Sequence, residues 1–101
     1  PNMLKSAEYR LTPEAARDME TLWLYTLKEW GLEQANRYTD ELTEAFGQLA
    51  ANPKMATPCE RIRKGYRRSQ VGRHAIYFRQ TDYGIVVVRV LHDRMLSTLH
   101  L

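Results

Sequence analysis

The chain has 101 residues, of which 44% are apolar, so it can form one domain with a single core. No apolar run approaches the roughly 20 residues that a membrane-spanning helix needs. The single cysteine, Cys59, excludes an intrachain disulfide, which suits a reducing cytoplasm, and three scattered histidines form no zinc-ligand pair with it. We therefore expect one cytoplasmic domain, residues 1–101, with no metal and no cofactor.

The net charge of +3 is modest, but the charges are distributed unevenly. Residues 14–44 hold eight acidic and three basic side chains, whereas residues 60–101 hold nine basic and three acidic ones. Solvated faces explain such a division without any partner. The alternative is that the basic half meets an acidic partner, either a nucleic acid or an acidic protein segment.

The chain begins with PNMLKSAEYR, which lacks the apolar stretch of a signal peptide. Pro1 and Asn2 precede Met3 and are interpreted as a cloning remnant, with the natural start at Met3. The alternation in EYRLT then predicts a short strand over about residues 7–11.

Two amphipathic helices follow this strand. The first begins with Thr12 as its N-cap and Pro13 at the first helical position, and Gly31 is a suitable stop. The second ends at the Asn52–Pro53 pair. Their apolar stripes are Ala15, Met19, Leu22, Trp23, Leu27 and Trp30 in the first helix, and Ala35, Tyr38, Leu42, Ala45, Phe46 and Leu49 in the second. So short a link predicts an antiparallel helix hairpin.

The C-terminal half contains three strand-like runs, YRRSQV, HAIYFRQ and GIVVVRVL, after a loop with at most a partial strand, PKMATPCERIRKG. Glycine turns at 71–73 and 82–84 separate the runs, which predicts a β-meander. The fold class is therefore α+β: an N-terminal strand and an antiparallel helix hairpin packed on an antiparallel β-meander sheet. We expect seven residues to be mostly buried: Trp23, Leu27, Leu42, Phe46, Ile76, Val88 and Val90.

The densest basic cluster lies in RIRKGYRR, and Arg73 and Arg79 follow it. Within the strand 66–71, Arg67 falls on one face of the sheet, while Tyr66 and Arg68 fall on the other. A sheet face that carries Arg beside Tyr can hold phosphates and stack bases. An edge strand that charge keeps soluble explains the same residues without any ligand.

The last strand ends in the segment LHDRM, residues 91–95. His92 can act as a general acid or base near neutral pH, but the sequence places no nucleophile beside it. Neither a GxSxG motif nor a phosphate-binding glycine loop is present. A structural role for His92 and a core-filling role for Met95 are equally compatible with the pattern.

The whole pattern resembles the RelE/ParE superfamily of toxins from bacterial type II toxin–antitoxin modules, and within it the ParE branch. The likeness extends from about Tyr9 to Met95 and is carried by TPEAARDMETLWLYTLKEWG, by NPKMATPCERIRKGYRRSQVGRHAIYF and by VVRVLHDRM. It implies a RelE/ParE-like fold and ParE-like inhibition of DNA gyrase by binding. The alternative that it leaves open is RelE-like, ribosome-dependent cleavage of mRNA.

The ribonuclease branch typically has an arginine after the glycine turn, where this chain has His74. Met95 and Leu101 stand where we would assign an arginine and a tyrosine, although His100 can replace the terminal group. Metal-free cleavage of a phosphodiester needs a base, an acid and a cation. Under this alternative the catalytic residues are Arg67, His74, His92 and His100. Under the ParE-like interpretation no residue is catalytic, and the target-binding residues are His92, Arg94 and Met95.

The resemblance also implies a cognate antitoxin as partner. We expect it to carry a DNA-binding domain and an amphipathic tail that folds on the toxin, with acidic residues for the basic half and apolar anchors for grooves beside the helix hairpin. The expected antitoxin-binding residues are Arg61, Arg63, Arg67, Arg68, Arg73 and Arg79. Neither a membrane partner nor direct sequence-specific DNA binding is expected of the toxin itself.

Overall fold

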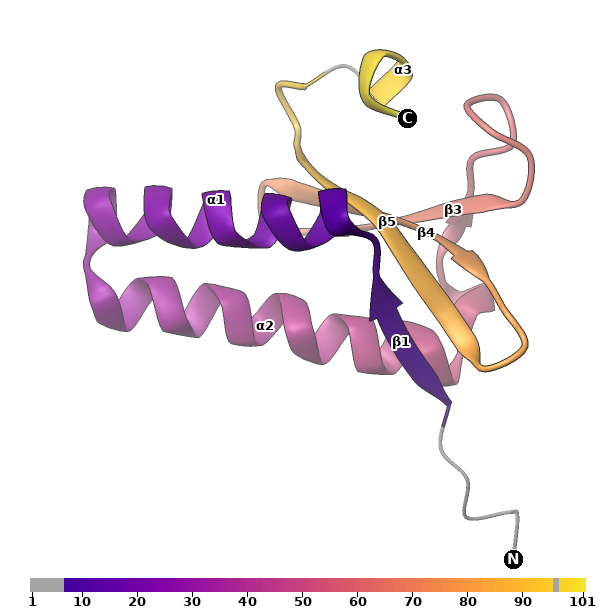
Figure 1. Ribbon diagram of the computed structural model, residues 1–101, viewed down its shortest axis with the longest axis horizontal. Coiled ribbons are helices and arrows are strands. Elements are labelled where there is room, and N and C mark those ends of the chain that lie inside the picture. The colour runs from indigo at the N-terminus through magenta and orange to yellow at the C-terminus, as the bar shows by residue number, and fades with distance from the viewer. Residues whose placement is uncertain (1–6, 96) are drawn as a thin grey trace, which may run out of the picture.

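A computed structural model describes residues 7–95 and 97–101, so the interpretation of Pro1 and Asn2 lies outside the described residues. The elements in chain order are β1 (Glu8–Leu11), α1 (Pro13–Trp30), α2 (Leu32–Ala51), the 3-10 turn η2 (Pro53–Met55), β2 (Thr57–Pro58), β3 (Tyr66–Val71), β4 (His74–Gln80), β5 (Gly84–His92) and α3 (Ser97–His100). The strands form one sheet in the order β1-β5-β4-β3-β2, and α1 and α2 form a hairpin beside it (Figure 1). This confirms the predicted α+β fold class.

The helices of the hairpin begin and end where the sequence predicts, because residues next to each helix end make the capping contacts. The Thr12 hydroxyl accepts a hydrogen bond from the Ala15 N–H at 3.0 Å, and Pro13 occupies the first turn. Gly31 adopts a positive φ of 95°, and its N–H donates to the Leu27 carbonyl. Since Gly31 alone separates α1 from α2, the two helices must run antiparallel.

The sheet is antiparallel from β2 to β5, as predicted, whereas β1 joins the far edge parallel to β5. A parallel pair needs a long crossover, and here the hairpin and the meander lie between the two strands. Glu8 pairs with Gly84, and a Cβ at Gly84 would collide with the Glu8 backbone. A glycine at this position therefore permits the close approach of β1.

The main core lies between the hairpin and one face of the sheet, which we call the hairpin face. Of the seven residues predicted to be buried, four are fully so: Leu42, Phe46, Ile76 and Val90. Trp23, Leu27 and Val88 are half-buried. Trp30, the last member of the predicted α1 stripe, is 73% exposed, because the joined ends of α1 and α2 project beyond the strands (Figure 1).

The opposite face of the sheet, which we call the outer face, carries a second and smaller core. Ala75, Tyr77 and Leu91 are buried there, beneath Cys59, Ile62, Val88 and Leu101. The loop between β2 and β3 and the C-terminal segment thus cover part of this face. Arg63 fastens the two, since its guanidinium donates to the Leu101 carbonyl at 2.7 Å. Among residues 7–95 and 97–101, no helix is both long and apolar enough to cross a membrane.

A candidate binding groove at the end of the sheet

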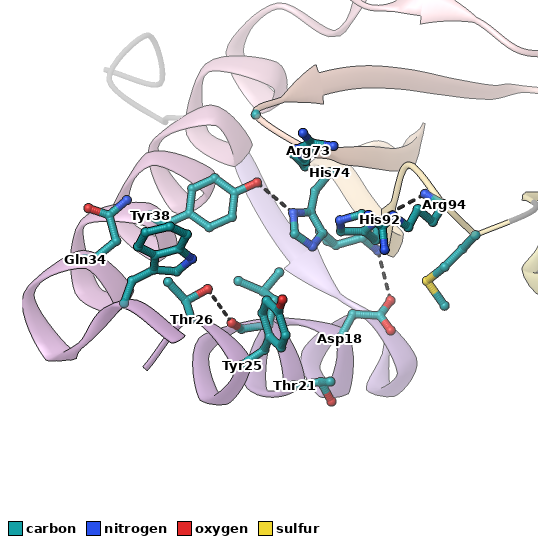
Figure 2. Close-up of a pocket in the computed structure, with 15 residues that line it drawn as sticks. Asp18, Thr21, Tyr25, Thr26, Gln34, Tyr38, Arg73, His74, His92 and Arg94 are labelled. Carbon is teal, nitrogen blue, oxygen red and sulfur yellow. Dashed lines mark hydrogen bonds between the residues drawn. The ribbon is translucent and has the colours of Figure 1, made fainter. Parts of the chain in front are cut away.

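A groove of about 730 Å³ opens where the helix hairpin passes the end of the sheet (Figure 2). Four parts of the chain line it: α1, α2, the turn between β3 and β4, and the end of β5 with the residues after it. The lining residues are Asp18, Thr21, Leu22, Tyr25, Thr26, Trp30, Gln34, Tyr38, Gly72, Arg73, His74, Val90, His92, Arg94 and Met95.

Tyr38 of α2 holds the β3–β4 turn against the hairpin. Its hydroxyl donates to the Val71 carbonyl at 3.0 Å. Gly72 has a positive φ of 55° and is the first central residue of a two-residue hairpin turn, as in type II′. A Cβ at Gly72 would lie 2.9 Å from the Tyr38 hydroxyl oxygen. The glycine therefore serves the turn and the Tyr38 contact together, and it sets Arg73 at the groove edge.

The same hydroxyl fixes the tautomer of His74. Tyr38 Oη lies 2.7 Å from His74 Nδ1, and because the hydroxyl proton points to Val71, Oη accepts from the Nδ1–H group (Figure 2). Neutral His74 then keeps an unprotonated Nε2. Burial, followed by the nearby His92, lowers the pKa of His74, and burial also raises the pKa of Tyr38. Both groups are therefore neutral near pH 7.

His92 faces His74 across the β4–β5 pair, with ring centroids 5.2 Å apart and planes at 89°. Its Nδ1 lies 3.1 Å from the Arg94 N–H and also 3.1 Å from the Asp93 carboxylate. These contacts need opposite states of Nδ1. Neutral His92 accepts from Arg94 and carries its proton on Nε2, whereas protonated His92 donates to Asp93. In the neutral state the groove thus holds an acceptor nitrogen on His74 and a donor nitrogen on His92.

Asp18 of α1 holds the end of β5 against α1, where both line the groove. Its carboxylate accepts from Arg89 Nε at 2.7 Å and from a terminal nitrogen of Arg89 at 2.8 Å. It also accepts from the Val90 N–H at 2.9 Å, beyond the end of β1. The hydrogen bond that Arg89 donates to Asp18 raises the pKa of Arg89 further. This bidentate pair neutralises the carboxylate that lines the groove.

Large apolar and aromatic side chains lie exposed along the groove. Trp30 is 73% exposed, Tyr25 63% and Met95 39%. Arg73 and Arg94 flank them, and neither guanidinium makes a hydrogen bond or an ion pair within the described residues 7–95 and 97–101.

In the same part of the chain, no three His, Cys, Asp or Glu side chains gather to hold a metal ion.

The predicted target-binding residues are brought together, since His92, Arg94 and Met95 all line the groove. The predicted ribonuclease set is only half assembled. His74 and His92 are neighbours, but Arg67 pairs with Phe78 near the other end of β3 and donates to the Ala56 carbonyl at 3.0 Å. His100 lies in α3, where its carbonyl accepts from Arg89, and its side chain is exposed and lines no part of the groove.

The six predicted antitoxin-binding arginines do not form one surface. Arg68 and Arg79 lie on the outer face, because they pair with Tyr77 and Tyr66. Arg67 lies on the hairpin face beside Phe78. The remaining three are in loops: Arg61 and Arg63 between β2 and β3, and Arg73 at the groove.

Several groove residues escaped the sequence analysis. Tyr38 was assigned only to an apolar stripe, and Asp18 was counted only as an acid. Tyr25 was not singled out at all, although a tyrosine outside the stripe of an amphipathic helix is a signal of exposed aromatic surface. The Asp18–Arg89 pair spans 71 residues, so no local pattern indicates it.

Comparison with known proteins identifies the family. The family described as the ParE toxin of the type II toxin–antitoxin system parDE matches residues 9–97. Toxin ParE1 of Mycobacterium tuberculosis is 43% identical over 91 residues, which cover 89% of this chain and 93% of the relative. Toxin ParE1 of Caulobacter vibrioides is 38% identical over 93 residues, which cover 92% and 96% of the two chains.

A solved structure agrees at the level of the fold. The chromosomal ParDE toxin–antitoxin system from P. aeruginosa is similar with a TM-score of 0.73 at 17% identity, over 87% of this chain and 97% of that chain. The family match and the two sequence relatives cover most of the chain, and the fold is the RelE/ParE-like one. The chain therefore belongs to the ParE toxin family of type II toxin–antitoxin systems.

Proposed function

We propose that this toxin inhibits DNA gyrase by binding it in the cytoplasm, and that a cognate antitoxin neutralises it. The observation that carries the proposal is the groove, in which His92, Arg94 and Met95 lie together beside exposed Tyr25 and Trp30. Aromatic and arginine side chains are the residue types that dominate binding energy at protein interfaces. A surface of this kind supports inhibition by stoichiometric binding, which needs no turnover.

The cognate antitoxin is proposed from the family and from the charge distribution. The P. aeruginosa structure is that of a ParDE toxin–antitoxin system, so a protein of this fold is found with such a partner. An acidic tail suits the arginines of the basic half, and apolar anchors suit the exposed side chains of the groove. The tail would gain most of its affinity from the anchors, because exposed ion pairs contribute only about 0–1 kcal/mol each.

Ribosome-dependent cleavage of mRNA is the second candidate, and one observation favours it. His74 Nε2 can accept a proton and His92 Nε2–H can donate one, and both line the groove together with Arg73 and Arg94. A base, an acid and a cation are the groups that metal-free phosphodiester cleavage needs. Against it stands the placement of Arg67 and His100 outside the groove.

Two assays on the purified chain test the proposal: inhibition of gyrase supercoiling, and cleavage of mRNA on ribosomes. We expect inhibition at a stoichiometric ratio to gyrase and no cleavage. The double variant Arg94→Glu with Met95→Ala should lose inhibition. Its matched control is Lys54→Glu with Met55→Ala, an exposed Met beside a base on η2, away from the groove, which should retain it. A parent protein that leaves supercoiling intact but cuts mRNA would replace gyrase inhibition with the second candidate.

A further inference from the structure

We propose that the groove also binds single-stranded nucleic acid, through its phosphates and the faces of its bases and without regard to sequence. This goes beyond the inhibition of gyrase, because it concerns a ligand that the toxin holds by itself. Four features carry the inference: two cations close together that have no partner among residues 7–95 and 97–101, exposed aromatic rings, polar histidine nitrogens between them, and the engagement of Arg63 and Arg68 on the outer face.

The two cations, Arg73 and Arg94, come from different strand ends that a backbone hydrogen bond joins. The Asp93 N–H donates to the Arg73 carbonyl at 2.9 Å, so the β3–β4 turn lies against the residues after β5. Both side chains are exposed and line the groove. Guanidinium groups bind phosphate oxygens through paired, charge-assisted hydrogen bonds. Two such groups on adjoining loops suit neighbouring phosphates of one strand.

Acidic groups near these cations are largely engaged. The Asp18 carboxylate lines the groove but is neutralised by Arg89. Asp93 lies beside the groove but does not line it. The groove therefore presents more free positive than negative charge, which favours an anionic ligand.

The aromatic surface is free to stack. Trp30 and Tyr25 lie on α1 with more than half of each residue exposed, and both line the groove. Single-stranded nucleic acid is bound in this way, by a basic path along the backbone beside rings on which unpaired bases stack. A duplex offers no free base faces to Trp30. The volume of about 730 Å³ lies within the usual range for small-ligand sites and suits a short stretch of nucleotides.

Between the cations and the rings lie two histidine nitrogens of opposite character. His74 Nε2 accepts a hydrogen bond, and His92 Nε2–H donates one whether its Nδ1 accepts from Arg94 or donates to Asp93. A phosphate oxygen can accept from His92, and a sugar hydroxyl or a base amino group can donate to His74. Such contacts orient a nucleotide without selecting a particular base.

The outer face also carries arginine beside tyrosine, but two of its arginines, Arg63 and Arg68, already contact other parts of the protein. Arg63 lies over the Tyr66 ring at 5.9 Å and Arg68 over the Tyr77 ring at 5.7 Å. Arg63 also donates to Leu101 and Arg68 to Gln70. Both of these cations are engaged by a carbonyl oxygen and lie over a ring, so they offer less to a nucleotide than Arg73 and Arg94 do.

The test is binding of fluorescein-labelled oligonucleotides to the full chain, read by fluorescence anisotropy from low to high salt. We expect a deca-deoxythymidine and a decauridine to bind, with a salt slope of about −1.4 for two neutralised phosphates. A duplex of the same length should bind more weakly. A preference for the DNA or the RNA oligomer would identify the natural source, and equal binding would show that phosphates and bases suffice.

Substitutions in the groove test whether the oligonucleotide binds there. Arg73→Glu with Arg94→Glu should weaken binding roughly tenfold or more, since both phosphate contacts become repulsive. The matched control, Arg37→Glu with Lys54→Glu, makes the same change in net charge outside the groove and should alter affinity less than about twofold. Trp30→Ala should weaken binding roughly fivefold or more, because it removes the ring on which a base stacks. It should also remove most of the quenching of tryptophan fluorescence by the oligonucleotide. The remaining tryptophan, Trp23, is half-buried and donates a hydrogen bond to Asn36.

Three results would overturn the inference. The first is that neither oligonucleotide binds the parent chain at low salt. The second is that both charge-reversal pairs weaken binding equally, which would indicate a general attraction to a basic protein. The third is that a decaglutamate peptide displaces the oligonucleotides at the concentration that unlabelled deca-deoxythymidine needs. That outcome would assign the groove to an acidic peptide.

Discussion

The groove and the outer face are built from the same residue types, arginine and tyrosine or tryptophan, yet they differ in what remains available. On the outer face Arg63 and Arg68 cover tyrosine rings and donate to the Leu101 carbonyl and the Gln70 side chain. At the groove Arg73 and Arg94 are free within the described residues 7–95 and 97–101, and the Trp30 ring is exposed. The density of charge along a sequence therefore does not locate a binding surface. What matters is whether each charge already has a partner.

The largest effect is expected from loosening the core on which both regions depend. Leu42 is fully buried between α2 and the hairpin face. Leu42→Ala should lower the free energy of unfolding by about 2–5 kcal/mol, because it removes apolar contacts and leaves a cavity. Urea denaturation followed by circular dichroism measures this. The control, Leu24→Ala, alters an exposed leucine of α1 and should stay within about 0.5 kcal/mol of the parent. Equal stabilities of the two variants would contradict the described core.

Arg67 and Arg68 allow the two faces of the sheet to be compared directly, because these neighbouring residues of β3 lie on opposite faces. Reversing both charges should slow association with an acidic antitoxin roughly tenfold at low salt and change dissociation less, since charges at the rim of an interface act mainly on the encounter. Stopped-flow association rates at increasing ionic strength measure the effect. The single variants should differ, because Arg67 is bonded to Ala56 whereas Arg68 faces outward. A rate indifferent to salt, with unchanged affinity, would show that the antitoxin lands elsewhere.

The titration of His74 gives the groove a pH dependence below neutral pH. The groups that face His74 are Tyr38, His92, Asp93 and Asp18, and burial is the main reason that its pKa is lowered. The unfolded chain then binds a proton more readily than the folded one, so stability falls as the pH drops below the ordinary value of 6.5 and is fully restored above it. Thermal unfolding between pH 5 and 7 should show this slope. His74→Gln should flatten it, and an unchanged slope would assign it to other groups.

The smallest effect is expected from removing proton transfer at the groove. Glutamine in place of His74 or His92 keeps hydrogen bonding but cannot shuttle a proton. A gyrase inhibitor that acts by binding should keep most of its activity in either variant. A ribonuclease should instead lose about 10²–10⁴-fold in rate. Supercoiling and ribosomal cleavage assays, run on the parent and both variants, separate the two. The binding interpretation fails if His74→Gln abolishes a cleavage that the parent performs.

Local signals in the sequence predicted most of the fold. The helix bounds follow from Thr12, Pro13 and Gly31, whose effects act within a few residues, and the meander follows from its glycine turns. The parallel attachment of β1 was not predicted, since it depends on a crossover of more than 70 residues. Trp30 belongs to the apolar stripe of α1 but is 73% exposed, because helical periodicity says which side of a helix is apolar but not where the underlying sheet ends.

The candidate site was predicted only in part. His92, Arg94 and Met95 were recognised because they end a strand together, and all three line the groove. Whether an arginine is free or engaged depends on contacts across the fold, such as Asp18 with Arg89 or Arg63 with Leu101. The sequence shows that these charges exist, but pairings over such distances are fixed only when the hairpin packs on the sheet.

The Asp18 carboxylate also affects how this protein behaves in crowded solution. Since β1 ends at Leu11, opposite Val87, the last part of β5 would present bare backbone groups to any passing strand. The Thr12 hydroxyl donates to the Val88 carbonyl, and Asp18 accepts from the Val90 N–H. The side chains of the N-cap Thr12 and of Asp18 in α1 thus close a sheet edge that could otherwise template intermolecular pairing. Loss of Asp18 would therefore favour aggregation through β5, even in molecules that remain folded.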